Sequence, residues 1–148
     1  MNPAPIPLLH GHSIPRLGLG TWPLKGDAVH EMVALALDIG YRLIDTSHKY
    51  LNEAPVGAAI RESGIAREEI FVTSKFNKEN HSVDGVQRAY DESLRRTGLD
   101  YLDLFLIHWP VPWLDTYVAA WRGLVRLVEQ GRVGAIGVSN FKRPHLER

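Results

Sequence analysis

Leu104-Phe105-Leu106-Ile107-His108 is the stretch of sequence that decides the fold. Its four apolar residues follow one another without alternation, which is typical of a strand buried on both faces of a parallel sheet. The run ends on a histidine, so a polar side chain stands at the carboxyl end of the strand. We therefore expect an α/β fold that carries its chemistry at the carboxyl ends of its strands.

The same alternation of strand and helix repeats along the chain. The predicted strands are Leu17–Gly20, Arg42–Asp45, Ile70–Lys75, Leu102–His108 and Val133–Ser139, and the predicted helices are Ala28–Ile39, Glu53–Ser63, Val83–Arg96 and Tyr117–Gln130. From Arg42 onward the strand starts recur at roughly 30 residues, the length of one βα unit. Before the first unit, Ile6–Leu9 and Ser13–Pro15 flank His10-Gly11-His12 and predict a β-hairpin.

Repeated βα units fit either an open doubly wound sheet or an eight-stranded barrel. An open dinucleotide-binding sheet needs a glycine-rich turn after its first strand, but Gly18-Leu19-Gly20-Thr21-Trp22-Pro23 lacks the third glycine and runs into proline. We therefore predict a TIM-type (β/α)8 barrel. Since a complete barrel takes about 250 residues, the 148 residues are expected to form a single partial barrel domain, truncated to about the first five βα units.

Composition narrows the class of partner. Lys and Arg total 17, as do Asp and Glu, so net charge attracts neither nucleic acid nor an anionic membrane. The chain has no cysteine, Met1–Leu9 does not resemble a secretory signal, and no apolar run is long enough to span a bilayer. His10 and His12 lack a third ligand, so we expect no metal site. These features predict a cytoplasmic protein whose partner is a small molecule.

Chemically active or aromatic side chains stand at or just after the carboxyl ends of the predicted strands. In chain order they are Trp22, Asp45, Lys75, His108 and the pair Ser139-Asn140. In a βα barrel these ends converge on one rim, where such barrels hold their active sites. Tyr50 lies five residues beyond Asp45, in the loop before the next helix. We expect Asp45, Tyr50, Lys75 and His108 to share one pocket.

This set of side chains suits the reduction of a carbonyl group. Hydride attack on C=O builds an alkoxide that must receive a proton. A phenol is a weak acid at neutral pH unless a nearby cation stabilises the phenolate, and Lys75 can supply that cation for Tyr50. Asp45 can hold Lys75 charged and oriented. His108 can hydrogen-bond the carbonyl oxygen or share in the proton transfer.

Several motifs resemble the aldo-keto reductase family, in register from about Pro5 to Arg148. They are Gly40-Tyr41-Arg42-Leu43-Ile44-Asp45-Thr46, Asn52-Glu53, Val56-Gly57, Val72-Thr73-Ser74-Lys75, Leu94 through Leu106 with His108-Trp109-Pro110, and Gly134 through Phe141. Within the family the chain is most similar to bacterial reductases of the 2,5-diketogluconate reductase type.

The resemblance implies a reductase of aldehydes and ketones that uses NADPH, with NADH as the alternative cofactor. It places the catalytic tetrad on Asp45, Tyr50, Lys75 and His108, with Tyr50 as the general acid. Cofactor contacts are expected at Thr21, Asp45, Ser139 and Asn140, and aromatic walls of the substrate pocket at Trp22 and Trp109. One segment departs from the family pattern: Ser47-His48-Lys49-Tyr50-Leu51 puts bulk and charge beside the acid, where small residues and Tyr-Gly are common.

Each of these residues also has a purely structural interpretation. Taken alone, His108 is a core histidine, Lys75 a solvated lysine, and Tyr50 a packing residue. The whole chain likewise admits two alternatives to an enzyme: a non-catalytic nucleotide-binding or regulatory module, and a half-barrel scaffold without a complete cofactor site. Because an open sheet exposes its edge strands, we expect self-association or pairing with a complementary fragment.

Overall fold

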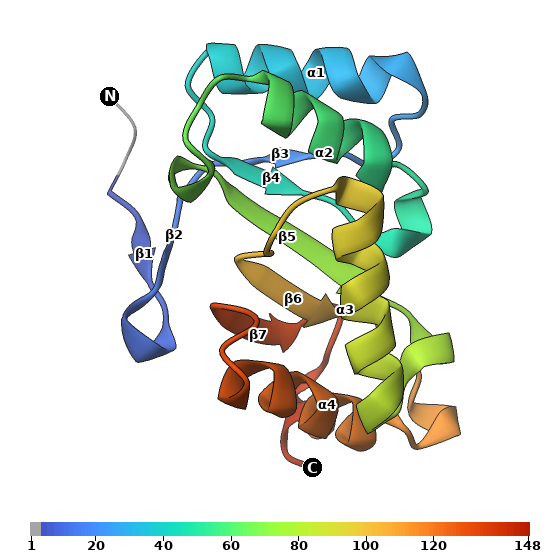
Figure 1. The fold of residues 1–148 in the computed structure, drawn as a ribbon. Helices are drawn as coiled ribbons and strands as arrows, with labels where there is room; N and C mark the ends of the chain where they lie inside the picture. Colours follow the sequence, from blue (N-terminus) through green and yellow to red (C-terminus); the bar gives the residue numbers. More distant parts are fainter. Residues whose placement is uncertain (1–3) are drawn as a thin grey trace.

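Five parallel strands form the centre of the molecule, and the computed structural model describes them within residues 4–148 (Figure 1). The strands are β3 (Leu19–Gly20), β4 (Leu43–Asp45), β5 (Phe71–Phe76), β6 (Leu104–Ile107) and β7 (Ala135–Val138), in the spatial order β3-β4-β5-β6-β7. Each neighbouring pair is parallel, so the predicted α/β class is confirmed. Residues 1–3, the start of the segment Met1–Leu9, lie outside the described residues.

The register of the sheet brings the predicted strand ends together. Gly20 pairs with Asp45, and Phe76 pairs with Ile107. The residues that follow these positions, Thr21 and His108, therefore emerge at the same edge of the sheet as the carboxylate of Asp45. This is the rim on which the sequence placed its candidate site.

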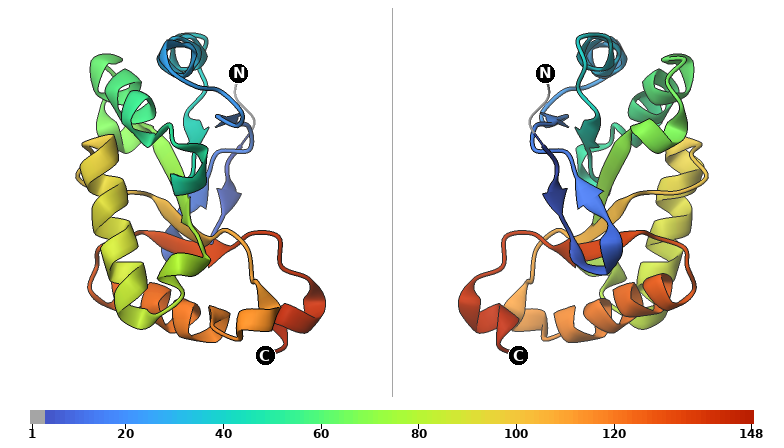
Figure 2. Two further views of the ribbon diagram at one scale, coloured as in Figure 1. Left: turned by 90° about the vertical axis from the view of Figure 1, so that its right-hand side faces the viewer. Right: turned by 90° about the vertical axis from the view of Figure 1, so that its left-hand side faces the viewer.

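Helices cover one face of the curved sheet (Figure 2). They are α1 (Asp27–Asp38), α2 (Glu53–Glu62), α3 (Val83–Thr97) and α4 (Tyr117–Glu129), followed by the short α5 (Arg143–Leu146). Helix α3 is capped at both ends. The Ser82 side chain accepts a hydrogen bond from the Gly85 amide at the start, and Gly98 ends the helix in the left-handed conformation at φ 65°. The four long helices agree with the predicted ones to within one or two residues.

The predicted hairpin is present, although its strands are shorter than expected. β1 (Ile6–Pro7) pairs antiparallel with β2 (Ser13–Ile14), and a 3₁₀ turn over Leu9–Gly11 joins them. The hairpin lies at the amino-terminal end of the parallel strands, opposite the rim (Figure 1). Further 3₁₀ turns lie at His48–Tyr50, Arg67–Glu69, Lys78–Asn80 and Pro112–Leu114. The sequence analysis missed these turns because such short segments have no hydrophobic period.

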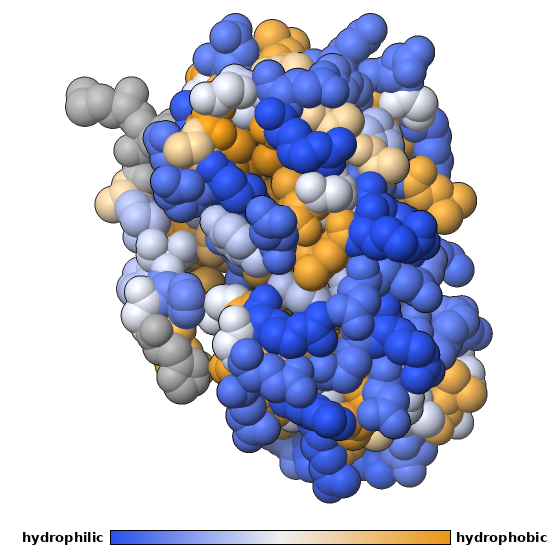
Figure 3. All heavy atoms as spheres, in the orientation of Figure 1, coloured by the Kyte–Doolittle hydropathy of each residue, from blue (hydrophilic) through white to orange (hydrophobic). Residues whose placement is uncertain are grey.

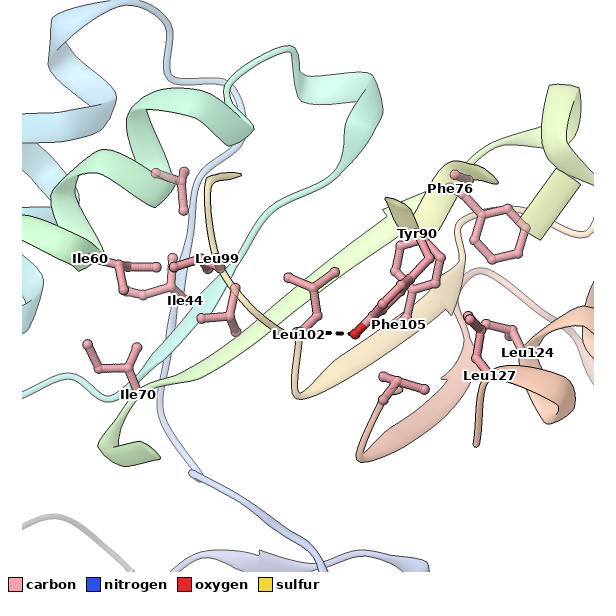
Figure 4. Packing of buried hydrophobic residues seen from close by; sticks show 14 of the residues in the cluster. Ile44, Ile60, Ile70, Phe76, Tyr90, Leu99, Leu102, Phe105, Leu124 and Leu127 are labelled. Atoms are coloured by element: carbon pink, nitrogen blue, oxygen red, sulfur yellow. Dashed lines mark hydrogen bonds between the residues drawn. The ribbon is translucent and has the colours of Figure 1, made fainter. Parts of the chain in front are cut away.

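The core fills the space between the sheet and its helices (Figure 4). Phe105 of β6 packs against Phe76 of β5 at a ring distance of 5.1 Å and against Tyr90 of α3 at 5.2 Å. The Tyr90 hydroxyl accepts a hydrogen bond from the Leu102 amide, so this large ring is buried without an unpaired oxygen. Helices α2 and α3 approach so closely at Gly57 that a Cβ atom there would lie 1.8 Å from the Thr97 carbonyl oxygen.

A buried carboxylate connects α2 and α3 to the middle strand. Glu53 is 2% exposed and accepts hydrogen bonds from Ser74 at 2.6 Å and Ser93 at 2.8 Å, while its second oxygen pairs with Arg96. Since Ser74 precedes Lys75 in β5, this network fixes the strand on its helix-covered face.

The outer surface over α2 and α3 is largely hydrophilic, with smaller hydrophobic areas (Figure 3). Among residues 4–148, none of the helices combines the length and the apolar character needed to cross a membrane.

Candidate active site

An ion pair between Asp45 and Lys75 forms the base of the site. Lys75 Nζ lies 2.7 Å from both carboxylate oxygens of Asp45 and donates to the Thr46 carbonyl oxygen at 3.0 Å. The Lys75 side chain is 8% exposed and that of Asp45 34%. Burial raises the pKa of Asp45 above its usual value, and the charge and hydrogen bond of Lys75 oppose that rise. Asp45 and the backbone therefore hold the ammonium group in a fixed position.

Tyr50 stands over this ammonium group. It ends the 3₁₀ turn His48–Tyr50, and its hydroxyl lies 3.5 Å from Lys75 Nζ. The same nitrogen lies 5.1 Å from the centre of the Tyr50 ring. The ammonium group therefore lies within hydrogen-bonding distance of the phenol oxygen and beside its ring.

His108 completes the group on the side of β6. Its ring centre is 5.6 Å from that of Tyr50, and the two rings meet edge to face. Burial, together with the positive charges of Lys75 and Lys49, lowers the pKa of His108 to about 4. The imidazole is therefore neutral at pH 7. Asp45, Lys75 and His108, predicted at three strand ends, and Tyr50, predicted in the loop after Asp45, thus lie together in the structure.

Two buried side chains that the sequence analysis did not assign to the site support these four residues. Asn52 donates to the carbonyl oxygens of Thr21 and Leu24 and accepts a hydrogen bond from Thr46 at 2.7 Å. Ser47 lies with its hydroxyl 3.0 Å from His108 Nδ1. From the sequence, the segment that contains Ser47 stands out only for its bulk and charge. Short hydrogen bonds between a loop and a distant strand leave no periodic signal in the sequence.

Thr21 is fully buried where the sequence predicted a cofactor contact. Its amide and its hydroxyl both donate to the Asp45 carbonyl oxygen at 3.0 Å. These bonds clamp the end of β3 to the end of β4. A direct contact between Thr21 and a cofactor stays a prediction.

Two tryptophans border the site and are largely exposed. Trp22 is 61% exposed, and its ring lies 5.3 Å from that of Tyr50. Trp109 is 53% exposed and stacks beside His108 at 6.4 Å. The two exposed indole rings on either side of Tyr50 and His108 suit a small molecule with apolar parts.

Ser139 and Asn140 follow β7 at the same rim. Asn140 Nδ2 donates to the His108 carbonyl oxygen at 2.9 Å and to Ser139 Oγ at 3.0 Å. Asn140 has φ 63°, a left-handed conformation that asparagine tolerates better than most residues. Its side chain thereby connects the edge strand to the tetrad. Within residues 4–148 no group of three His, Cys, Asp or Glu side chains is arranged to hold a metal ion.

Comparison with known proteins places this arrangement in a family. Residues 16–148 match the aldo/keto reductase family. The chain belongs to the aldo/keto reductase family. It is 43% identical over 147 residues to the methylglyoxal reductase DkgA of Escherichia coli, covering 99% of this chain and 53% of that protein. An aldo-keto reductase of Mycobacterium bovis is 49% identical, with 96% of this chain and 50% of that protein covered.

Solved structures of other family members have the same fold. An aldo/keto reductase from Brucella melitensis superposes with a TM-score of 0.94 at 45% identity, covering all of this chain and 57% of that one. A mutant of Gox0644 in complex with NADPH gives a TM-score of 0.91 at 42% identity, with 98% and 52% covered. The chain therefore spans about half the length of the relatives it matches.

Proposed function

We propose that this aldo/keto reductase chain carries the proton-donating site of an enzyme that reduces aldehydes and ketones to alcohols. The observation that carries the proposal is the position of the Tyr50 hydroxyl, 3.5 Å from an ammonium group that Asp45 holds in place. A phenol beside a buried cation has the chemistry to protonate the oxygen of a reduced carbonyl group.

Each residue has a separate task in this mechanism. Tyr50 donates the proton, and Lys75 stabilises the phenolate that remains. Asp45 orients Lys75 and offsets its charge, so that the site does not bury an unpaired cation. His108 is neutral at pH 7 and offers one ring nitrogen to the group that occupies the site. Trp22 and Trp109 form the apolar borders.

A nicotinamide cofactor fits the residues at the end of β7. Asn140 and Ser139 present an amide and a hydroxyl, which can pair with the carboxamide of a nicotinamide, and Asn140 is exposed. When bound, a reduced nicotinamide supplies the hydride. Gox0644 is a relative solved with NADPH, and we propose NADPH for this protein, with NADH as the alternative. Thr21 and Asp45 are proposed to border the same site.

We propose small aldehydes and ketones as substrates. The methylglyoxal reductases among the relatives favour a small dicarbonyl compound as the first to be tested. The test is a steady-state assay of NADPH and NADH oxidation by the purified protein with methylglyoxal. We expect saturable oxidation that depends on the aldehyde. Absence of such oxidation in a folded protein that binds NADPH would overturn the proposal.

One observation favours the second candidate, a half-barrel scaffold. β7 is the last strand of the sheet order, and hollows of ≈ 450 and ≈ 410 Å³ lie on either side of Trp121 between β7 and α4. Both are lined mainly by apolar side chains. A second copy of the chain offers the same apolar surface, so we propose self-association as the partner contact here.

A further inference from the structure

The Ser47 hydroxyl lies at the junction of three groups. It is fully buried, 3.0 Å from His108 Nδ1, 3.2 Å from the Lys75 carbonyl oxygen, and 3.2 Å from the Lys49 amide nitrogen. It thus contacts the imidazole of the site and the backbone of the strand that carries Lys75. The hydrogen bonds of this one oxygen constrain where His108 carries its proton.

A serine hydroxyl has one hydrogen to donate and two lone pairs to accept with. The Lys49 amide is a donor and uses one lone pair, while the Lys75 carbonyl oxygen can only accept. Two arrangements remain for His108. Either Ser47 donates to Lys75 and accepts from a protonated Nδ1, or Ser47 donates to a bare Nδ1 and gives up its bond to Lys75.

The first arrangement uses every donor and acceptor at the junction. In the second, the Lys75 carbonyl oxygen loses its hydrogen bond from Ser47, and an unpaired buried acceptor is unfavourable. The 3.0 Å between Ser47 Oγ and His108 Nδ1 is a hydrogen-bonding distance in either arrangement, so the choice rests on the pairing of the Lys75 carbonyl oxygen.

We propose that Ser47 is a positioning residue that holds the proton of neutral His108 on Nδ1 and leaves Nε2 as a hydrogen-bond acceptor in the site. This inference rests on the proposed function of the same site. It selects between the two roles open to His108, because a bare Nε2 cannot donate to a carbonyl oxygen. Tyr50 is then the proton donor to the substrate, and His108 accepts a hydrogen bond from a hydroxyl group.

The test is nitrogen NMR of the histidine rings in the full chain, labelled with ¹⁵N-histidine and measured at pH 7 without cofactor or substrate. Loss of a ring signal in His108→Gln assigns His108 among the seven histidines. In the wild-type protein we expect a protonated Nδ1 and a bare Nε2. In Ser47→Ala the Nδ1 proton has lost its acceptor, so the tautomer ratio shifts toward Nε2–H by about tenfold. Ser47→Thr keeps a hydroxyl and is expected to keep the wild-type tautomer.

A bare Nδ1 in the wild-type spectrum overturns the inference, even if the variants fail to fold. An unchanged tautomer in folded Ser47→Ala overturns it as well. The result is independent of turnover. A protein with the expected tautomer and no carbonyl reduction refutes the proposed function, whereas a working reductase with Nε2–H refutes only the role of Ser47.

Discussion

Strands β5 and β7 both deliver residues to the rim, but they do so from different surroundings. β5 has a hydrogen-bonded neighbour on each side, and all of its residues except the first are buried, while every residue of β7 is half-buried. Lys75, on β5, is held by a carboxylate and a carbonyl oxygen. Asn140, after β7, is exposed and held by a neighbouring side chain and one carbonyl oxygen. Lys75 is therefore held by more contacts and is more deeply buried than Asn140.

Breaking the ion pair between Asp45 and Lys75, at the carboxyl ends of β4 and β5, is expected to have the largest effect on stability and activity. Lys75→Met leaves the partly buried Asp45 carboxylate without its cation, so the free energy of unfolding falls by about 2 kcal/mol and carbonyl reduction falls by at least about 100-fold. Chemical denaturation and steady-state assays measure the two effects. Lys78→Met removes an exposed lysine just beyond β5 and serves as the control. Equal effects of the two substitutions would contradict the assigned role of Lys75.

The neutral state of His108 predicts a pH dependence of stability. Its folded pKa of about 4 lies below the unfolded value of 6.5. Its contribution is therefore complete above pH 6.5 and is lost as the pH falls toward 4. In His108→Gln we expect the loss of unfolding free energy between these pH values to be smaller by roughly 2 kcal/mol. His81, whose pKa burial also lowers, stays in both proteins as a common background. Identical pH profiles would contradict the prediction.

A substitution of Asn140, after β7, is expected to change cofactor binding more than stability. Asn140→Gly keeps the left-handed backbone at φ 63° and removes the amide group. We expect a change in unfolding free energy below about 1 kcal/mol and an NADPH dissociation constant about tenfold higher, as measured by cofactor fluorescence. Asn80→Gly, in the turn after β5, is the matched control. Unchanged NADPH affinity would remove Asn140 from the cofactor site.

The smallest effect concerns the apolar surface beside β7. Trp121 is 41% exposed and borders both hollows there. Trp121→Glu puts a charge on this surface and is expected to weaken self-association about tenfold, as measured by sedimentation equilibrium. Trp113→Glu is the control, because Trp113 is 79% exposed and lies in the Pro112–Leu114 turn. A monomeric wild-type protein, or equal effects of the two substitutions, would contradict the prediction.

Sequence patterns predicted most of what the repeating elements determine. The apolar run Leu104–Ile107 and the repeated alternation of strand and helix were enough to predict the parallel sheet, and strand-end positions were enough to bring Asp45, Lys75 and His108 together. The 3₁₀ turn that ends at Tyr50 and the hydrogen bonds of the Ser47 hydroxyl could not be predicted. They depend on contacts between residues far apart in the sequence, such as Ser47 and His108, which are 61 positions apart.

The most direct test of the proposed proton transfer is aldehyde-dependent NADPH oxidation by Tyr50→Phe, compared with Tyr41→Phe. Tyr41 is an exposed tyrosine before β4, at the opposite end of the sheet from the rim. We expect Tyr50→Phe to lower the turnover number by about 10²–10⁴-fold with NADPH binding retained, because only the proton donor is removed. Tyr41→Phe should turn over at the wild-type rate. Undiminished turnover in Tyr50→Phe would contradict the assignment of Tyr50 as the general acid.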